Sequence, residues 1–308
     1  MSKYLISICF FAIVSGGLYG CKNETSSRQE ETILMGTTSI MTDETLTPII
    51  EDQVSVFESS YNAKINLISK SEAEILNALL NDSISIAILS RRLTNEELKI
   101  FTNRKIYPKT TGFGTDAVVF IRNSATNDTL IDMSAVIDFL HGKSVPNIKG
   151  LVFDNPNSST VRYLDSVAEI SKPRSDGIYS FNNNAEAIKY VAENDGFIGV
   201  VGLSWITQPS EELAKLRNKI NVLSVRGLKG GDYVSPTQNN IAERKYPLAR
   251  DLFIVNSQAY AGLGMGFASF ITGERGQRII LKSGLLPIRI PGRKITIRNN
   301  VEKEKVNN

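Results

Sequence analysis

Hydroxyl-bearing residues gather in the middle of the chain, in the segment Asp154-Asn155-Pro156-Asn157-Ser158-Ser159-Thr160-Val161-Arg162. The segment follows a short apolar run, Leu151 to Phe153, which is typical of the end of a buried strand. Apolar residues recur at helical spacing from Val161 onward, so Ser158 or Ser159 is placed to cap a helix. The first turn of a helix leaves N–H groups unpaired, and with the macrodipole they favour an anion. On this segment alone, an ordinary helix cap that binds nothing is the better interpretation.

Two other segments repeat this order of strand end, polar side chains and helix start. They are Thr37-Thr38-Ser39, after the apolar run 33–35, and Ser90-Arg91, after an expected strand at 84–89. In α/β sheets, ligands collect beyond the carboxyl ends of strands, at helix N-termini. Three such loops therefore predict a binding site for an oxyanion. Arg91 is the favoured donor because it is nearer to the strand end than Arg92, although paired arginines are often a solvated surface.

The elements that must position these loops alternate between strand and helix, which predicts an α/β fold with helices covering the sheet. Two capping boxes, Ser71 with Glu74 and Thr94 with Glu97, mark helix starts. Strands are expected at 33–35, 64–68, 84–89, 116–121, 151–153, 197–202 and 252–255, and helices at 50–61, 71–80, from 94, 134–140, 158–168, 184–191, 259–272 and 276–281.

The N-terminus has the pattern of an export signal. An apolar stretch from Tyr4 to Val14 follows a positive residue, and it is too short to span a bilayer comfortably. Leu18-Tyr19-Gly20-Cys21 resembles a bacterial lipobox, so residues 1–21 are expected to be a lipoprotein signal with Cys21 as the lipidated residue. The alternative is that Cys21 is a free cysteine near a cleavage site. The polar residues 22–32 are interpreted as a tether.

Composition excludes several classes of chemistry. The net charge of +3 is small for 308 residues and gives no indication of nucleic-acid binding. With one histidine, His141, and two cysteines, a zinc-type metal site is not expected, nor is any cofactor. A hydrolase that used Ser158 or Ser159 as nucleophile would need a base. His141 stands at a predicted helix end, where it better fits a partner of the helix dipole.

Several short motifs, in order and spacing, resemble the phosphate-binding proteins of Pst-type ABC transporters, a family of exported substrate-binding proteins. The resemblance covers roughly Gly36 to Pro287. The motifs are Gly36-Thr37-Thr38-Ser39, Asn157-Ser158-Ser159-Thr160, Gly196-Phe197-Ile198-Gly199-Val200, Tyr246-Pro247-Leu248, Gly266-Phe267 with Phe270, Gly276-Gln277, and Gly284-Leu285-Leu286-Pro287.

The resemblance implies a periplasmic-binding-protein type II fold, in which two α/β domains are joined by two crossovers and hold the ligand between them. Domain I would comprise residues 33–115 and 247–292, and domain II residues 116–246, with 293–308 as a polar tail. The phosphate ligands implied by the motifs and the loops are Thr38, Ser39, Ser90, Arg91, Asp154, Ser158, Ser159, Thr160 and Arg162.

The chain departs from the family pattern in its charges. The family usually has Asp after the third strand and Arg before a Gly-Ser-Gly-Thr loop, whereas this chain has Ser90-Arg91 and Asp154 at those places. An Arg can donate in pairs to an oxyanion, and a carboxylate can accept the proton that remains on monohydrogen phosphate. The exchange either keeps both roles or changes which anion is chosen.

The expected function is capture of inorganic phosphate by a periplasmic lipoprotein that works with an ABC permease and ATPase and is held at the membrane by its lipid. A monomer that is not an enzyme and binds no nucleic acid is expected. The alternatives are a binder of another oxyanion, such as sulfate, arsenate or a phosphoester, and a phosphate-sensing lipoprotein without a transport role.

Overall fold

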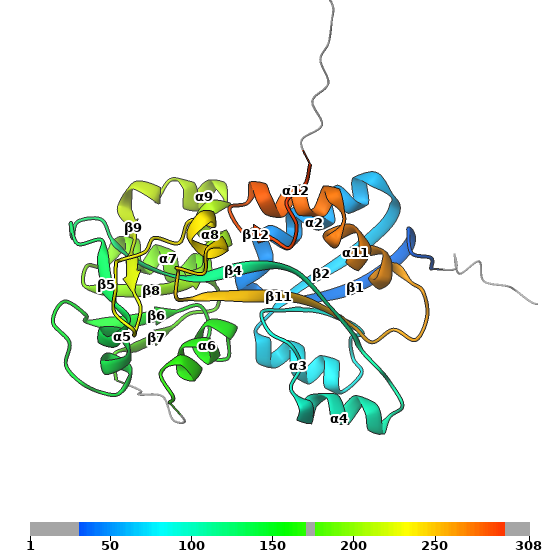
Figure 1. The fold of residues 1–308 in the computed structure, drawn as a ribbon, viewed down its shortest axis with the longest axis horizontal. Coiled ribbons are helices and arrows are strands. Elements are labelled where there is room, and N and C mark those ends of the chain that lie inside the picture. The colour runs from blue at the N-terminus through cyan, green and yellow to red at the C-terminus, as the bar shows by residue number, and fades with distance from the viewer. Residues whose placement is uncertain (1–30, 171–175, 293–308) are drawn as a thin grey trace, which may run out of the picture. The chain divides into compact units, whose positions relative to one another are not determined.

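A mixed sheet of ten strands runs through the computed structural model, in the order β2-β1-β3-β11-β4-β8-β6-β7, with β12 and β9 paired to β4 (Figure 1). The structure describes residues 31–170 and 176–292. The expected signal 1–21, Cys21, nearly all of the tether and the tail 293–308 lie outside these residues. From Glu31 onward the chain forms one compact unit.

The first strand group is parallel, because β1 pairs in the same direction with β2 and with β3. The predicted capping boxes at Ser71 and Thr94 are both formed and begin α3 and α4. This group contains β1 (Met35–Asp43), β2 (Asn62–Lys70), β3 (Ile86–Leu89) and the helices α2 (Thr47–Ser60), α3 (Glu72–Leu80) and α4 (Asn95–Asn103).

The second strand group is also parallel, because β6 pairs with β7 and with β8. Strands β6 and β8 are short and buried, which agrees with the apolar runs in the sequence. The group contains β6 (Gly150–Phe153), β7 (Ile178–Ser180), β8 (Phe197–Gly202) and the helices α5 (Met133–Leu140), α6 (Ser159–Val167) and α7 (Asn184–Glu193).

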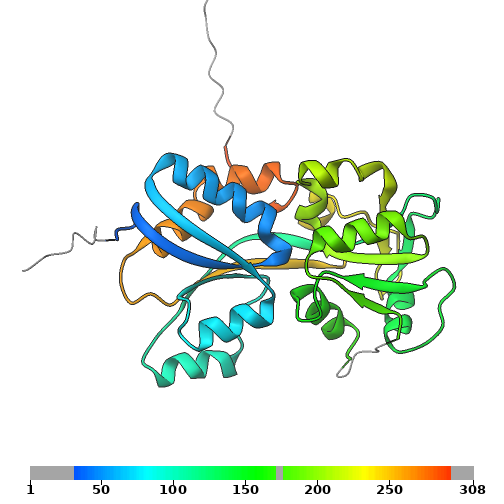
Figure 2. The same ribbon diagram turned by 180° about the vertical axis from the view of Figure 1, so that it is seen from behind.

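Two long antiparallel strands connect the groups, β4 (Lys109–Asn123) and β11 (Ala249–Asn256). The first part of β4 pairs with β11, which itself pairs with β3, and residues Val118–Arg122 pair with β8. Figures 1 and 2 show both strands passing from one group to the other. Helices α3 and α6 lie on the same side of these strands in both views.

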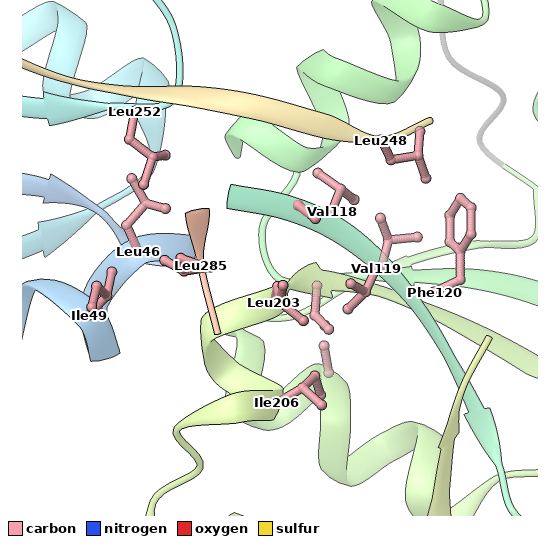
Figure 3. Packing of buried hydrophobic residues seen from close by; sticks show 14 of the residues in the cluster. Leu46, Ile49, Val118, Val119, Phe120, Leu203, Ile206, Leu248, Leu252 and Leu285 are labelled. Atoms are coloured by element: carbon pink, nitrogen blue, oxygen red, sulfur yellow. The ribbon is translucent and has the colours of Figure 1, made fainter. Parts of the chain in front are cut away.

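Apolar side chains from both groups form one continuous core along the long strands. Figure 3 shows Leu252 and Leu285 near Leu46 at one end of this region, and Val119 near Leu203 at the other. Burying each such side chain contributes about 1.5–3 kcal/mol, so the core stabilises the crossing as well as each group.

The remaining elements are short or lie at the C-terminal end of the chain. No helix in the described ranges is long and apolar enough to cross a membrane. These elements are η1 (Glu44–Leu46), β5 (Leu130–Asp132), α8 (Leu203–Thr207), α9 (Glu211–Ala214), η2 (Arg217–Lys219), β9 (Ile220–Val222), β10 (Ser224–Arg226), α10 (Gln238–Ala242), α11 (Leu263–Thr272), α12 (Glu274–Lys282) and β12 (Leu286–Pro287).

The structure corrects the first predicted loop. Thr38 and Ser39 lie inside β1, which continues to Asp43, so the prediction that they follow the end of a strand is wrong. Thr is β-branched and fits a strand well, and here the polar residues pair with β2 instead of forming a loop. Helix α7 begins at Asn184, as expected for the helix 184–191, and Asn183 is its side-chain cap.

Candidate ligand-binding site

A buried ion pair joins the two long strands. Arg250 of β11 stands opposite Asp116 of β4 in the antiparallel register. Its Nη2 and Nε lie 2.9 and 3.2 Å from Asp116 Oδ2, and both side chains are almost fully buried. A guanidinium has five N–H donors, so this carboxylate leaves others for further partners.

The remaining donors of Arg250 reach hydroxyl groups from both strand groups. Nη1 donates to Ser159 Oγ at 2.7 Å, at the start of α6, and Nη2 donates to Thr45 Oγ1 at 2.8 Å, in η1. The two hydroxyl oxygens are themselves 3.3 Å apart. Arg250 therefore lies where the first and second strand groups meet.

The end of β1 supplies the next charge. Asp43 caps η1, since its Oδ1 accepts from Thr45 N at 3.1 Å and from Thr45 Oγ1 at 2.9 Å. Glu44 reaches across to α7, where its carboxylate accepts from the backbone N of Asn184 at 3.1 Å and from the Asn184 side chain. The sequence predicted polar residues after the first strand at 37–39. In the structure, residues 42–45 take that place at the end of β1.

The start of α6 has the predicted hydroxyl arrangement. Ser158 is the N-cap and accepts from Val161 N. Its Oγ lies 2.8 Å from Thr160 Oγ1, which donates to Asp154 Oδ1 at 2.7 Å. The side chains of Asp154, Ser158 and Thr160 therefore form one connected network beside Ser159.

Burial dominates the protonation of these acids. It raises the pKa of Asp154 to about 6, although the Thr160 and Ser158 hydroxyls oppose it. Burial and the nearby charge of Asp154 raise the pKa of Glu44 to about 8. Burial also raises the pKa values of Asp43 and Asp116, against the opposing charge of Arg250. Burial disfavours the charge of Arg250, but Asp116 and Asp43 outweigh it and raise the pKa of the guanidinium.

One oxygen of each of three carboxyl groups accepts no hydrogen bond from the described residues. They are Asp43 Oδ2, Asp116 Oδ1 and Asp154 Oδ2, and all are shielded from solvent. Buried polar atoms are normally paired, so these unpaired oxygens, two near Arg250 and one beside the start of α6, indicate a place for another partner. Those oxygens can accept protons from a ligand.

The other predicted cations lie in a second cluster, around the buried Glu72 at the start of α3. Arg91 Nε and Arg162 Nε lie 3.0 and 2.5 Å from Glu72 Oε1, and Ser90 Oγ lies 3.5 Å from Glu72 Oε2. Arg91 also makes a two-bond contact with Glu97, at 2.8 and 2.7 Å. Arg91, which the sequence favours as the anion donor, thus gives its donors to carboxylates in this structure.

The structure therefore divides the predicted site residues among three places. Asp154, Ser158, Ser159 and Thr160 lie beside Arg250; Ser90, Arg91 and Arg162 surround Glu72; Thr38 and Ser39 lie within β1. Sequence reasoning missed Asp43, Thr45, Asp116, Arg250, Glu44 and Glu72. Of these residues, Asp116 had a local signal, because it is a charged residue at the start of the expected strand 116–121.

Comparison with known proteins defines the class. A family model described as "PBP superfamily domain" matches residues 26–275, and the chain belongs to this family. The predicted fold class, a two-domain α/β fold of the periplasmic-binding-protein type II kind, is confirmed. Among individual relatives, the "Phosphate-binding protein PstS" of Borreliella burgdorferi is 28% identical over 308 residues, 94% of this chain and 100% of the relative.

Solved structures agree on the fold. A putative phosphate ABC transporter substrate-binding protein with bound phosphate, from Clostridium perfringens, matches with a TM-score of 0.68 at 17% identity, over 82% of this chain and 100% of that one. An ABC-type phosphate transport receptor from Vibrio cholerae matches with a TM-score of 0.59 at 17% identity, over 81% and 99%. The chain is thus similar to these proteins along almost their whole length.

Proposed function

We propose that this chain is an exported binding protein that captures inorganic phosphate for an ABC importer. The observation that carries the proposal is the meeting of one buried guanidinium, Arg250, with the hydroxyls of Thr45 and Ser159 from the two strand groups. The names of the relatives support phosphate as the ligand and import as the role.

The proposed contacts match the chemistry of a protonated tetrahedral oxyanion. Arg250 and the N-terminus of α6 would donate to its charged oxygens. Asp154 Oδ2, or the unpaired oxygen of Asp43 or of Asp116, would accept its remaining proton. Sulfate carries no proton near neutral pH, so it would leave these carboxyl groups facing a like charge without a bridge. A site that strands buried polar groups in this way discriminates strongly, which favours phosphate over sulfate.

Ligand entry would require movement, because the donors contact one another in this structure. Ser159 Oγ lies 2.7 Å from Arg250 Nη1 and 3.3 Å from Thr45 Oγ1, so an anion cannot fit between them as they stand. The start of α6 would move away from η1 to admit phosphate, and the same hydroxyls would then face the ligand. The structure thus corresponds to a closed arrangement.

A binding role fits better than an enzymatic one. A serine nucleophile needs a base, and His141 is held at the end of α5 with Nε2 3.1 Å from the carbonyl oxygen of Ala168. The fold alone does not decide between transport and sensing. The second candidate is therefore a phosphate-sensing lipoprotein.

We also propose how the protein is exported, anchored and divided into domains. The protein would be exported by the signal 1–21, lipidated at Cys21, and located at the cell envelope as a monomer that delivers phosphate to a permease and its ATPase. The domain division would follow residues 33–115 with 247–292, and 116–246. The first limit lies in β4 shortly before its pairing passes from β11 to β8, and the second lies just before β11 begins.

Native mass spectrometry tests the ligand directly. The protein is exchanged into a volatile buffer with inorganic phosphate, sulfate or neither, and the mass of the retained species is read. We expect one phosphate per chain and no retained sulfate. Equal retention of both anions would reassign the site to a general oxyanion binder, and retention of neither would remove the proposal.

A further inference from the structure

Glu72 connects two arginines that come from different strand groups. Its Oε1 is 3.0 Å from Arg91 Nε, which follows β3 in the first group. The same oxygen is 2.5 Å from Arg162 Nε, which belongs to α6 in the second group. The Glu72 side chain is 3% exposed, whereas that of Arg162 is 37% exposed. A buried carboxylate is thus paired with a guanidinium at the edge of the opposite group.

Helix α6 contains both a proposed ligand contact, Ser159, and the arginine of this ion pair, Arg162. Its first residue, Ser159, contacts Arg250 and Thr45, and Arg162 lies three residues further along the helix. Residues three apart lie on neighbouring parts of one helix surface. The position of Arg162 therefore fixes the orientation of the turn that presents the proposed ligand hydroxyls.

A second contact joins the same two elements. The backbone N of Ala73, next to Glu72, lies 3.4 Å from the carbonyl oxygen of Asn157, just before α6. Elsewhere, α8 contacts η1: Trp205 Nε1 donates to the carbonyl oxygen of Glu44 at 3.1 Å, and Ser204 Oγ donates to the carbonyl oxygen of Thr45. The α3–α6 contact differs from these contacts because it is centred on an ion pair, and its arginine, Arg162, is partly exposed to solvent.

We propose that Glu72 is a positioning residue that latches α6 of the second group onto α3 of the first. Arg91 stays paired to Glu97 whether or not the latch is closed, since both belong to the first group. Arg162 is the part that moves. Breaking a buried charge pair raises the dissociation rate of an interface because it leaves the remaining charge unpaired. The latch would thus control how often the site opens.

The first experiment measures the latch without any ligand. Spin labels at Lys99→Cys in α4 and Ser166→Cys in α6, both exposed positions, report the separation of the two groups in a Cys9→Ser/Cys21→Ser background. We expect Glu72→Gln and, independently, Arg162→Gln to add a longer-distance population. The matched control is Glu74→Gln in the same helix, whose carboxylate contacts Ser71 and Lys70 and not α6. Distances for both variants that match this control would overturn the proposal.

The second experiment uses inorganic phosphate and rests on the proposed function. Stopped-flow release should be about tenfold faster in Glu72→Gln than in Glu74→Gln, as for loss of a buried charge partner. The double variant Glu72→Gln/Arg162→Gln should be no faster than either single variant, because both remove one interaction. Additive effects would contradict a shared latch. If wild type binds no phosphate, the proposed function fails, while the spin-label distances still decide the latch.

Discussion

At the residue scale, Arg250 carries the positive charge of the buried cluster. It faces Asp116 directly and also lies within the electrostatic reach of Asp43 and Glu72. Such a buried pair contributes little compared with an apolar pair of the same shape, but removing one partner strands the other charge. Arg250 is therefore expected to matter for both folding and binding.

Replacing Arg250 with Gln should lower the free energy of unfolding by about 3–5 kcal/mol, because Asp116 would stay buried without its partner. Urea titration measures this. Arg278→Gln is the control, since Arg278 is 44% exposed and pairs with Glu274 on the surface, so its change should stay within about 0.5 kcal/mol. Similar losses in both variants would show that Asp116 does not depend on Arg250.

The raised pKa of Glu44 predicts how the free energy of unfolding changes with pH. Its folded pKa is raised from 4.5 to about 8, so the folded state holds the proton more tightly than the unfolded state. Its stabilising contribution is complete below the unfolded pKa and is lost as pH rises through the folded pKa. The free energy of unfolding should therefore fall between pH of about 4.5 and 8, by up to about 1.4 kcal/mol per pH unit.

The Glu44→Gln variant provides the comparison. Its unfolding free energy should be flatter over the same pH interval, because the titrating group is gone. Glu212→Gln alters a fully exposed carboxylate and should keep the wild-type slope. A slope that persists unchanged in Glu44→Gln would assign the pH dependence to other groups.

At the element scale, neighbouring serines at the start of α6 are expected to have different roles, one in stability and one in binding. Ser158 caps the helix, whereas Ser159 contacts Arg250 and Thr45. Ser158→Ala should cost about 1 kcal/mol of stability, with a smaller effect on phosphate affinity than Ser159→Ala. Thermal unfolding and calorimetric titration of both variants test the split. The reverse order of affinities would place Ser158 and not Ser159 at the ligand.

Gly202, at the end of β8, allows the second group to approach η1. A Cβ at this position would lie 2.6 Å from the carbonyl oxygen of Thr45. Gly202→Ala should therefore push η1 away, costing about 1–3 kcal/mol of stability and weakening phosphate binding. At Gly227 the nearest atom would be Pro247 Cβ at 3.5 Å, an ordinary contact, so Gly227→Ala is the matched control. Equal behaviour in calorimetry would show that the close approach is not needed.

Much of the element order could be predicted from the sequence, because its signals are local. The capping boxes at Ser71 and Thr94, the cap at Ser158 and the apolar run 197–202 each lie within one element and are confirmed. The first loop was mistaken because Thr37-Thr38-Ser39 suits a polar loop and a paired strand equally well. Only the pairing of β1 with β2 decides between them.

The centre of the site could not be predicted in this way. Arg250 and Asp116 are 134 residues apart and meet through the register of two long strands. No periodicity within either strand indicates that pairing. The same holds for Glu72 and Arg162, whose contact depends on how α3 and α6 approach each other. Long-range pairings of charged residues require the tertiary structure.

At the scale of the whole molecule, β4 and β11 are the continuous connections between the strand groups, and the polar cluster lies beside them. A ligand held by Thr45 on one side and Ser159 on the other would bind both groups at once. Binding would therefore favour an arrangement in which the ligand separates Ser159 from Thr45, by the difference in affinity between that arrangement and the one seen here.

Calorimetric titration of the wild-type protein with inorganic phosphate, and in parallel with sulfate, tests the central claim most directly. We predict one phosphate site per chain, much weaker sulfate binding, and at least about a tenfold loss of phosphate affinity in Arg250→Lys, which keeps the charge but loses the paired donors. Absence of phosphate binding in the wild type, or an Arg250→Lys variant with unchanged affinity, would contradict the account.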